Sequence, residues 1–410
     1  MIIGINASFL RKIDSGTGQV TVNFLRQLAR RELKKDASAR RKFFLYLEED
    51  FSWEKLGLDK EEGESLFEKR IFLPKYRRDD LIRKIWWEKW LLPAKAEKDG
   101  CRIFFSLYQS ATVFKNGKIR HLMLVHDVIW KIFPQYLNNL RKKFYYFLVD
   151  GSIVRADRIL TISLSSQRDL EKFFPLSKDK IKVAAIDCDQ VFKKGRRQSE
   201  ESKTILKRYG IDQPGFIFYV GGFDRRKNIG FLLEAYGRMW EKYGYLWEQK
   251  GKNFPDLVLA GKFNRNLVPL VENLPEKITW VAKKFSVPKN KIKRAGFVAQ
   301  EDLPAFYSLA GLFVFPSLYE GFGLPPLEAF HCDCPVLTNR NSSLEEVVGE
   351  GGQLSFLMDD PGKTAQKMAE ILTDEKKTQA MLEQGRKRRE LFDWEKFVGK
   401  VEEEWSALLK

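Results

Sequence analysis

The sequence predicts an α/β protein of two domains, each built around a doubly wound parallel sheet. Short apolar runs alternate with amphipathic helical patterns along almost the whole 410-residue chain. Several of these runs are apolar at every position, which is typical of strands buried on both faces of a parallel sheet. The length suits two domains of roughly 200 residues each. Ligands of such domains bind outside the carboxyl ends of the strands, so a cleft is expected there.

The expected strands are bounded by Gly, Pro, Asn or charged residues. They are 1–6, Phe43–Leu47, Arg102–Phe105, His121–Val125, Arg158–Ile162, Phe216–Val220, Leu257–Ala260, Leu312–Phe315 and Val336–Thr338. Helices are expected between them. One should begin after Asn228, an N-cap residue followed by apolar residues at helical spacing. Another should begin at Ser343, which forms a capping box with Glu346.

The two halves meet in a polar, charge-rich segment. Residues 191–213 are therefore interpreted as a linker between an N-terminal domain, 1–190, and a C-terminal domain, 214–390. Residues 391–410 contain apolar residues at helical spacing and predict a last amphipathic helix.

Charge and composition exclude several classes of protein. The longest apolar runs fall well short of the roughly 20 residues that span a bilayer, and the N-terminus begins with a strand rather than a signal peptide. Four cysteines are too few for a disulfide scaffold and lack the spacing of a zinc finger. These features favour a cytoplasmic protein. The net charge of +17 implies an acidic partner.

The segment Lys75–Trp90 interleaves basic and aromatic residues. Such a segment is open to three interpretations: a polyanion-binding surface, a helix resting on an anionic membrane, or rings that belong to the N-terminal core.

The most informative motif is residues 316–329, which directly follow an expected strand. Gly321 and Gly323 lack a Cβ, so their backbone amides can approach a ligand closely. Two prolines then suit the first turn of a helix, whose free N–H groups form an anion site. Glu320 and Glu328 flank this site and would repel a phosphate, so their natural targets are hydroxyl groups on either side of it. A sugar and a ribose joined by a diphosphate have this arrangement.

A second motif follows the strand Phe216–Val220. It contains two glycines, Gly221 and Gly222, and then adjacent cations that include Arg226 and Lys227. Cations at this position place positive charge where a departing diphosphate needs it.

These two motifs resemble glycosyltransferase family 4, the retaining enzymes of GT-B architecture. Its signature of two glutamates separated by seven residues is matched by Glu320 and Glu328 with Gly-Phe-Gly-Leu-Pro between them. The resemblance implies that Glu320 contacts the donor sugar and Glu328 the ribose hydroxyls. It also implies that the main chain of Gly321, Phe322, Gly323 and Leu324 binds the sugar and the phosphate.

The resemblance extends to the other candidate residues. It implies that Arg226 and Lys227 bind the diphosphate beside Gly222, and that His126, after the strand His121–Val125, reaches the donor sugar. This sequence departs from the family pattern at two positions. Some relatives have Arg where this chain has Gly222, and many have Pro where it has Arg225. Among the loops, Gly16 and Gly18 would face the diphosphate, and the main chain near Val298 would hold the base. The last helix would pack back on the N-terminal domain.

The sequence thus predicts a retaining hexosyltransferase with a nucleotide diphosphate sugar as donor, for which mannose is a candidate. The acceptor would be a hydroxyl of a saccharide or of a lipid-linked acceptor at the inner face of the plasma membrane. No metal or other cofactor is expected, because no Asp-x-Asp stands at a metal position, and nucleic acid is not an expected partner. Two alternatives are a nucleotide-sugar epimerase of the same fold and a non-enzymatic polyanion-binding protein.

Overall fold

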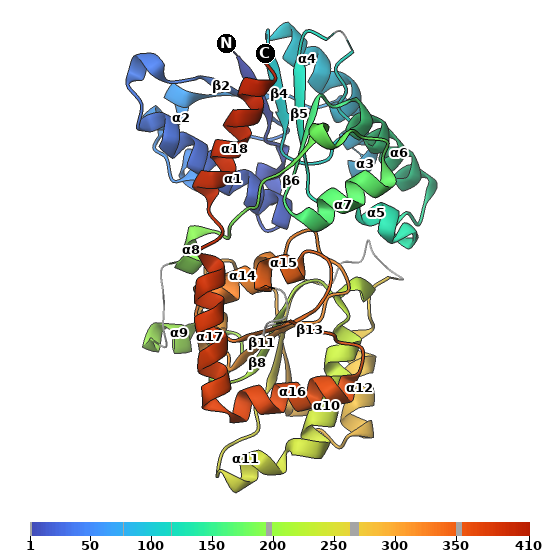
Figure 1. The fold of residues 1–410 in the computed structure, drawn as a ribbon, viewed down its shortest axis with the longest axis vertical. Helices are drawn as coiled ribbons and strands as arrows, with labels where there is room; N and C mark the ends of the chain where they lie inside the picture. The colour runs from blue at the N-terminus through green and yellow to red at the C-terminus, as the bar shows by residue number, and fades with distance from the viewer. Residues whose placement is uncertain (1, 77, 116, 194–198, 263–269, 350–354) are drawn as a thin grey trace. The chain divides into compact units, whose positions relative to one another are not determined.

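The computed structural model describes residues 2–76, 78–115, 117–193, 199–262, 270–349 and 355–410. The chain divides into two compact units, each a parallel sheet covered by helices (Figure 1). Unit 1 comprises Met1–Asp187 and Phe392–Lys410, and unit 2 comprises Cys188–Leu391. The last helix of the chain, α18 (Trp394–Ala407), is therefore part of unit 1.

The sheet of unit 1 has seven strands in the order β3-β2-β1-β4-β5-β6-β7, and all of its pairs are parallel. The central strands are buried at nearly every position, as their continuous apolar sequence predicts. The strands are β1 Ile3–Asn6, β2 Phe43–Leu47, β3 Phe67–Ile71, β4 Ile103–Ser106, β5 Arg120–Val125, β6 Arg158–Thr161 and β7 Ile181–Val183.

The longer helices of unit 1 begin at side chains that accept hydrogen bonds from free backbone N–H groups. Ser15 caps α1 through the amide of Gly18, and Asn139 caps α6 through the amide of Lys142. The helices are α1 Gly16–Leu33, α2 Lys60–Leu66, α3 Asp80–Trp86, α4 Leu92–Lys98, α5 Ile129–Ile132, α6 Leu140–Arg155 and α7 Leu164–Phe173. A π-helical turn, η4 (Trp87–Leu91), joins α3 to α4.

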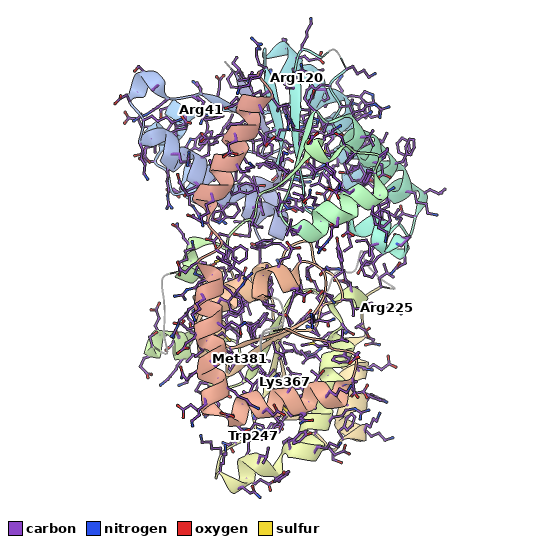
Figure 2. All side chains as sticks on the ribbon, in the orientation of Figure 1. Arg41, Arg120, Arg225, Trp247, Lys367 and Met381 are labelled. Atoms are coloured by element: carbon purple, nitrogen blue, oxygen red, sulfur yellow. The ribbon has the colours of Figure 1, made fainter. Side chains whose placement is uncertain are left out.

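Helix α18 lies against α1 and buries an aromatic cluster in unit 1 (Figure 1). The Trp405 ring is 1% exposed, with its centroid 5.8 Å from that of Phe43 and 6.4 Å from that of Phe24. Charged side chains close the edge of this contact. Arg31 pairs with Glu402 at 2.8 Å, and Arg41, labelled in Figure 2, pairs with the same carboxylate.

The sheet of unit 2 has six parallel strands in the order β10-β9-β8-β11-β12-β13. In both sheets the order of the strands reverses at an inner pair, β1/β4 in unit 1 and β8/β11 in unit 2. Such reversals create the crevices in which doubly wound sheets bind ligands. The strands are β8 Ile217–Val220, β9 Leu257–Ala260, β10 Ile292–Gly296, β11 Leu312–Phe315, β12 Val336–Asn339 and β13 Ser355–Phe356.

The helices of unit 2 include one inside the segment for which the sequence predicts a linker. Within 191–213, α9 (Glu200–Arg208) forms part of unit 2, because its Ile205 and Leu206 are buried where α9 packs on α13; residues 194–198 lie outside the described residues. The other helices are α8 Gln190–Lys193, α10 Ile229–Tyr243, α11 Tyr245–Gln249, α12 Leu274–Lys284, α13 Leu303–Leu309, α14 Leu324–His331, α15 Leu344–Val348, α16 Pro361–Thr373 and α17 Glu375–Arg389.

Other elements also differ from the sequence prediction. The edge strands β3, β7, β10 and β13 are not among the expected strands, since β3 and β10 contain charged residues and the other two are very short. Asn228 precedes α10 as expected, but it has a φ of 55° and its side chain makes no capping hydrogen bond. Within the described residues, no helix combines the length and the apolar character needed to cross a bilayer.

The position of Trp405 predicts that α18 contributes strongly to the stability of unit 1. Replacing a buried Trp by Ala removes its apolar contacts and leaves a cavity, so Trp405→Ala should lower the free energy of unfolding by about 3–5 kcal/mol. The exposed Leu409 near the same terminus is the matched control, and Leu409→Ala should change it by less than about 0.5 kcal/mol. Urea unfolding followed by tryptophan fluorescence and circular dichroism measures both. Equal stability of the two variants would contradict the packing of α18.

Candidate functional site

The topology of unit 2 brings two loops to one edge of its sheet. β8 and β11 are adjacent parallel strands, so residues 221–228 and residues 316–323 leave the sheet side by side. Their contact is direct, since the backbone N–H of Leu318 donates to the carbonyl of Arg226 at 2.8 Å. The two motifs singled out in the sequence therefore meet where the strand order reverses.

Glu320 lies between the two cations of the other loop. Its Oε1 is 2.6 Å from Lys227 Nζ and 3.0 Å from Arg226 Nη1. All three side chains are mostly buried, at 13–14% exposed. Burial alone would raise the pKa of the Glu320 carboxyl, but Lys227, Arg226 and a hydrogen bond from Ser317 lower it to about 2. The carboxylate is therefore ionised at all physiological pH values.

The same cluster includes a second carboxylate. Asp224 is buried and lies 3.5 Å from Arg226 Nε. Arg226 also donates to the carbonyl of Tyr319 at 2.5 Å. Arg225, by contrast, is exposed at the surface of the unit (Figure 2). Of the adjacent cations, Arg226 and Lys227 are thus the two whose side chains belong to the site.

Three serines position the Glu320 loop, and sequence reasoning missed this role. Ser317 Oγ donates to Glu320 Oε1 at 2.6 Å, and Ser342 Oγ accepts from the Glu320 N–H at 3.0 Å. Ser343 Oγ donates to the Glu320 carbonyl at 2.7 Å. The capping box expected at Ser343 is wrong for this reason: α15 does begin there, but the hydroxyl bonds the Glu320 loop and makes no capping hydrogen bond.

The glycine-rich stretch leads into the N-terminus of α14. Gly323 has a φ of 124°, which favours glycine, and a Cβ there would lie 3.0 Å from Leu344 Cδ2. Helix α14 then begins at Leu324 with prolines in its first turn, as the sequence predicts. Between them, Phe322 is buried and Gly321 is partly exposed. In the facing loop, the carbonyl of Gly222 accepts a hydrogen bond from the Tyr219 hydroxyl at 2.5 Å.

Glu328, on the second turn of α14, has an environment opposite to that of Glu320. Its Oε2 accepts a hydrogen bond from the Tyr307 hydroxyl at 2.8 Å. Burial raises its pKa to about 7, and the single hydrogen bond from Tyr307 opposes this increase only in part. The carboxyl group therefore changes charge close to neutral pH.

The expected base-binding region lies at the carboxyl ends of β9 and β10. Val298 is buried, whereas the neighbouring Phe297 ring is exposed. The centroid of this ring lies 3.5 Å from Lys262 Nζ. Gly261 fits tightly against the loop after β8, because a Cβ there would lie 1.9 Å from the Gly221 carbonyl oxygen. The structure thus places the loop after β9 beside the loop that contains Gly221 and Gly222, and the role of Val298 stays a prediction.

In unit 1, His126 is fixed at the carboxyl end of β5. Its Nε2 is 2.9 Å from the carbonyl oxygen of Leu107, and its backbone N–H donates to Gln109. A carbonyl only accepts, so Nε2 carries the proton and Nδ1 is an acceptor. Burial lowers the pKa of His126, with the Leu107 bond and Asp127 opposing it. Asp127 accepts from the Ile129 amide and so orders the following turn.

Gly16 and Gly18 form the first turn of α1. At Gly18 a Cβ would lie 2.1 Å from the carbonyl oxygen of Lys12, so the neighbouring 3-10 turn, η1 (Ser8–Lys12), already requires glycine. The backbone N–H of Gly18 donates to Ser15 Oγ at 3.1 Å. Gly16 has open space around its Cα. The structure therefore gives Gly18 a packing role, and the binding roles of both glycines stay predictions.

A buried polar network near the carboxyl ends of β1 and β4 was not evident in the sequence. Glu88 on η4 accepts hydrogen bonds from Tyr108 at 2.7 Å and from Tyr145 at 3.0 Å. Tyr108 also contacts Asn6, the last residue of β1, and Ser8. No sequence pattern signals this network, because its members are far apart in the chain and each is ordinary alone.

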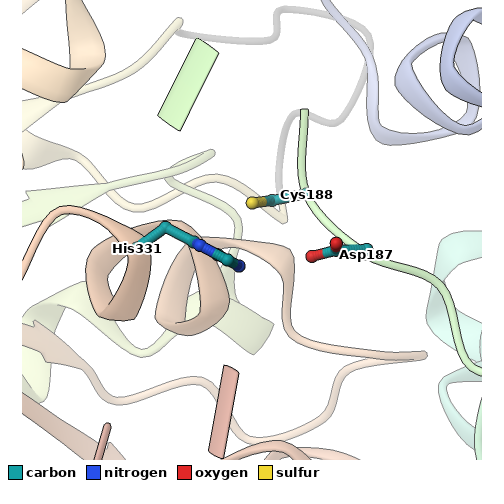
Figure 3. A group of neighbouring side chains, drawn as sticks. All are labelled: Asp187, Cys188 and His331. Atoms are coloured by element: carbon teal, nitrogen blue, oxygen red, sulfur yellow. The ribbon is translucent and has the colours of Figure 1, made fainter. Parts of the chain in front are cut away.

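Two side chains of unit 2 that could bind a metal, Cys188 and His331, lie near each other. Figure 3 shows the ring of His331 at the end of α14 and the thiol of Cys188; Asp187, also drawn, belongs to unit 1. The Cys188 and His331 ligand atoms lie within 4.8 Å of each other. Two ligands are fewer than zinc sites use, so this pair does not by itself define a metal site.

Comparison with known proteins defines the class. Residues 201–388 match the family of glycosyl transferases group 1. The chain resembles the solved structure of WaaG, a glycosyltransferase involved in lipopolysaccharide biosynthesis, with a TM-score of 0.68, 14% identity and 98% of each chain covered. Residues 201–388, which make up most of unit 2, thus form a domain of the glycosyl transferases group 1 family, and the chain has the GT-B fold.

Two further proteins are similar to this chain. The O-antigen chain mannosyltransferase B of Escherichia coli is 29% identical over 279 residues, which cover 67% of each chain. The solved structure of Anabaena Alr3699/HepE in complex with UDP and glucose has a TM-score of 0.69 at 15% identity, with 99% of each chain covered.

The environment of Glu328 predicts a pH-dependent gain in stability on its replacement. Its folded-state pKa of about 7 lies above the ordinary value of 4.5, so ionisation destabilises the folded protein above pH 7. This cost disappears as the pH falls through 7 towards 4.5. Glu328→Gln removes the charge and should stabilise the protein at pH 8 by about 1–2 kcal/mol.

Urea unfolding of wild type and Glu328→Gln at pH 8 and at pH 5 tests this prediction. The difference between the two proteins should be present at pH 8 and nearly absent at pH 5. Glu345→Gln, on the neighbouring helix α15, is a control for loss of one carboxylate. A Glu328→Gln protein that is less stable than wild type at pH 8 would show that the carboxylate is stabilised when ionised.

Proposed function

We propose that the protein is a retaining hexosyltransferase that uses a nucleotide diphosphate sugar, with mannose as the sugar, and needs no metal. The observation that carries this proposal is the cluster of Glu320, Arg226 and Lys227 at the N-terminal end of α14. It combines two cations for a diphosphate with an ionised carboxylate for sugar hydroxyls. The name of the related mannosyltransferase B supports mannose, and the UDP complex of HepE supports a nucleotide donor.

The proposal gives the following roles to residues of the candidate site in unit 2. The diphosphate is bound by Arg226, Lys227 and the amides of Gly323 and Leu324 at the helix N-terminus. Glu320 then exchanges its contact with the cations for hydroxyl groups of the sugar. Glu328 accepts hydrogen bonds from the ribose when it is ionised.

The reaction follows from this assignment. With Glu328 on the ribose and Asp224 paired with Arg226, Glu320 is the one carboxylate assigned to the sugar, whereas a double displacement needs two. We therefore infer a substitution on one face of the sugar. The bond between the anomeric carbon and the diphosphate breaks, and a bond to the acceptor hydroxyl oxygen forms. The departing phosphate takes the hydroxyl proton, and the two cations stabilise the negative charge that it gains.

The acceptor is a hydroxyl of a saccharide or of a lipid-linked saccharide in polysaccharide synthesis. The related O-antigen enzyme supports this class of acceptor. A lipid-linked acceptor would bring the enzyme to the inner face of the plasma membrane. His126 contacts the donor sugar in this proposal, and this role rests on the family resemblance of the sequence.

Substitution of the cations tests the proposal. Lys227→Met removes a charge that acts on the leaving diphosphate, so kcat should fall about 100-fold or more. Arg225→Met, in the same turn but exposed, should change kcat by less than about twofold. Product formation with a panel of nucleotide diphosphate sugars and O-antigen-type acceptors is the assay, and circular dichroism checks folding of both variants.

Three results would contradict the proposal. Equal activity of Lys227→Met and Arg225→Met would show that the Lys227 cation has no role in catalysis. Donor turnover without a glycosylated product would indicate an epimerase. Loss of activity in a chelator, with recovery on addition of a divalent cation, would show that a metal stabilises the leaving group.

A further inference from the structure

The solvent-facing side of α6 carries an apolar stripe. Leu140, Phe144, Phe147 and Val154 are 82%, 52%, 70% and 38% exposed, respectively. Their spacing of four, three and seven residues puts them on one face of the helix. The opposite face of α6 is already buried in the core of unit 1 through Tyr145, Val149 and Ile153. The helix is thus apolar on two sides, and one of them faces solvent.

A pair of exposed tryptophans adds to this surface. Trp86 and Trp90 are 45% and 55% exposed, with ring centroids 6.3 Å apart, whereas Trp87 between them is fully buried. α3 packs against α6, and Lys89 of η4 lines the same cavity as Phe147 and Val154. We call these four α6 side chains, together with Trp86 and Trp90, the apolar surface. Arg77, within the basic aromatic stretch noted in the sequence, lies outside the described residues.

A cavity of about 860 Å³ opens beside the apolar surface and contains three cations, Lys89, Lys115 and Arg155. They lie close enough together to affect one another, since burial, Arg155 and Lys115 all lower the pKa of Lys89. Asp150 is the one acidic residue in its lining, and its carboxylate is bound by Trp130 at 2.9 Å and Lys131 at 2.6 Å. Among the described residues, no carboxylate pairs with any of the three cations.

We propose that this face of unit 1 docks on an anionic phospholipid bilayer, with a lipid phosphate in the cavity and the apolar surface in the interfacial layer. Tryptophan and phenylalanine beside lysine and arginine are the side chains that bind this layer. Cations with no carboxylate partner gain attraction from the negative surface of such a membrane. In a symmetric dimer through the same face, they would instead bring like charges together. The docking face contains no residue assigned to the donor, so it stands independently of the proposed transferase reaction.

Co-sedimentation with vesicles tests the proposal with the full chain. Wild type should bind phosphatidylglycerol vesicles, bind much less to phosphatidylcholine vesicles, and dissociate as salt is raised. Lys89→Gln/Arg155→Gln should weaken binding about fivefold for each cation removed. Phe144→Ser/Phe147→Ser should weaken it by about tenfold or more at the same salt. Matched controls in unit 2 are Lys283→Gln on α12 and Tyr245→Ser on α11, both exposed, and neither should change binding.

Several outcomes would overturn the proposal. If Lys89→Gln/Arg155→Gln binds like wild type, the cavity has no role in docking. If Phe144→Ser/Phe147→Ser binds like wild type, the apolar surface has none. Inorganic phosphate binding at millimolar concentration without any wild-type binding to vesicles would indicate a site for a soluble anion. A dimer in analytical ultracentrifugation that Phe144→Ser/Phe147→Ser dissociates would indicate a second copy as the occupant. Unchanged thermal unfolding of the variants shows that they are folded, and unchanged donor binding separates this result from the transferase site.

Discussion

The site of unit 2 depends on the burial of Glu320 between Arg226 and Lys227. A buried carboxylate is costly unless cations and hydrogen bonds compensate it, and here both are present within 3.0 Å. With Asp224 beside Arg226, the cluster holds two cations and two carboxylates. This balance allows four charged side chains to be mostly buried at one sheet edge. The ion pairs of Glu320 with Arg226 and Lys227 also hold the loop after β11 against the loop after β8.

The two glutamates of the motif differ in charge state although only seven residues separate them. Glu320 has two cations and a serine hydroxyl, which hold its pKa at about 2, whereas Glu328 has one tyrosine hydroxyl and a pKa of about 7. Groups whose environments push their pKa values apart are often assigned to different tasks. The same chemical group therefore serves as a permanent negative charge in the loop and as a group of variable charge on the helix.

The central strands of both sheets could be read from the sequence, because short continuous apolar runs such as Leu312–Phe315 are typical of strands that are buried on both faces. The two motifs of the candidate site could be read for a similar reason, since each directly follows such a run. Edge strands could not, because β3 contains charged residues at its centre like a surface segment. The role of Ser343 was also hidden, since its local pattern fits a helix cap equally well. Only the meeting of β11 and β12 shows that its hydroxyl reaches Glu320.

The partners that set side-chain properties are the least predictable part. Glu328 owes its raised pKa to burial beside Tyr307, and His126 owes its tautomer to the carbonyl of Leu107. Both partners lie outside the element that carries the titrating group, at a separation of 21 residues for Glu328 and 19 for His126. Local spacing carries no information about such contacts, because they arise when the sheet brings separate segments together.

Because α18 completes unit 1, the order of synthesis and the order of folding differ in this chain. Domains usually fold as they leave the ribosome, with the N-terminal one first. Unit 2 is fully synthesised at Leu391, but the core of unit 1 lacks Trp405 until the segment Phe392–Lys410 follows. The sides of the Phe24 and Phe43 rings that contact Trp405 therefore stay uncovered while unit 2 is translated. A nascent chain of this protein should depend on holding chaperones for longer than its first 187 residues alone would suggest.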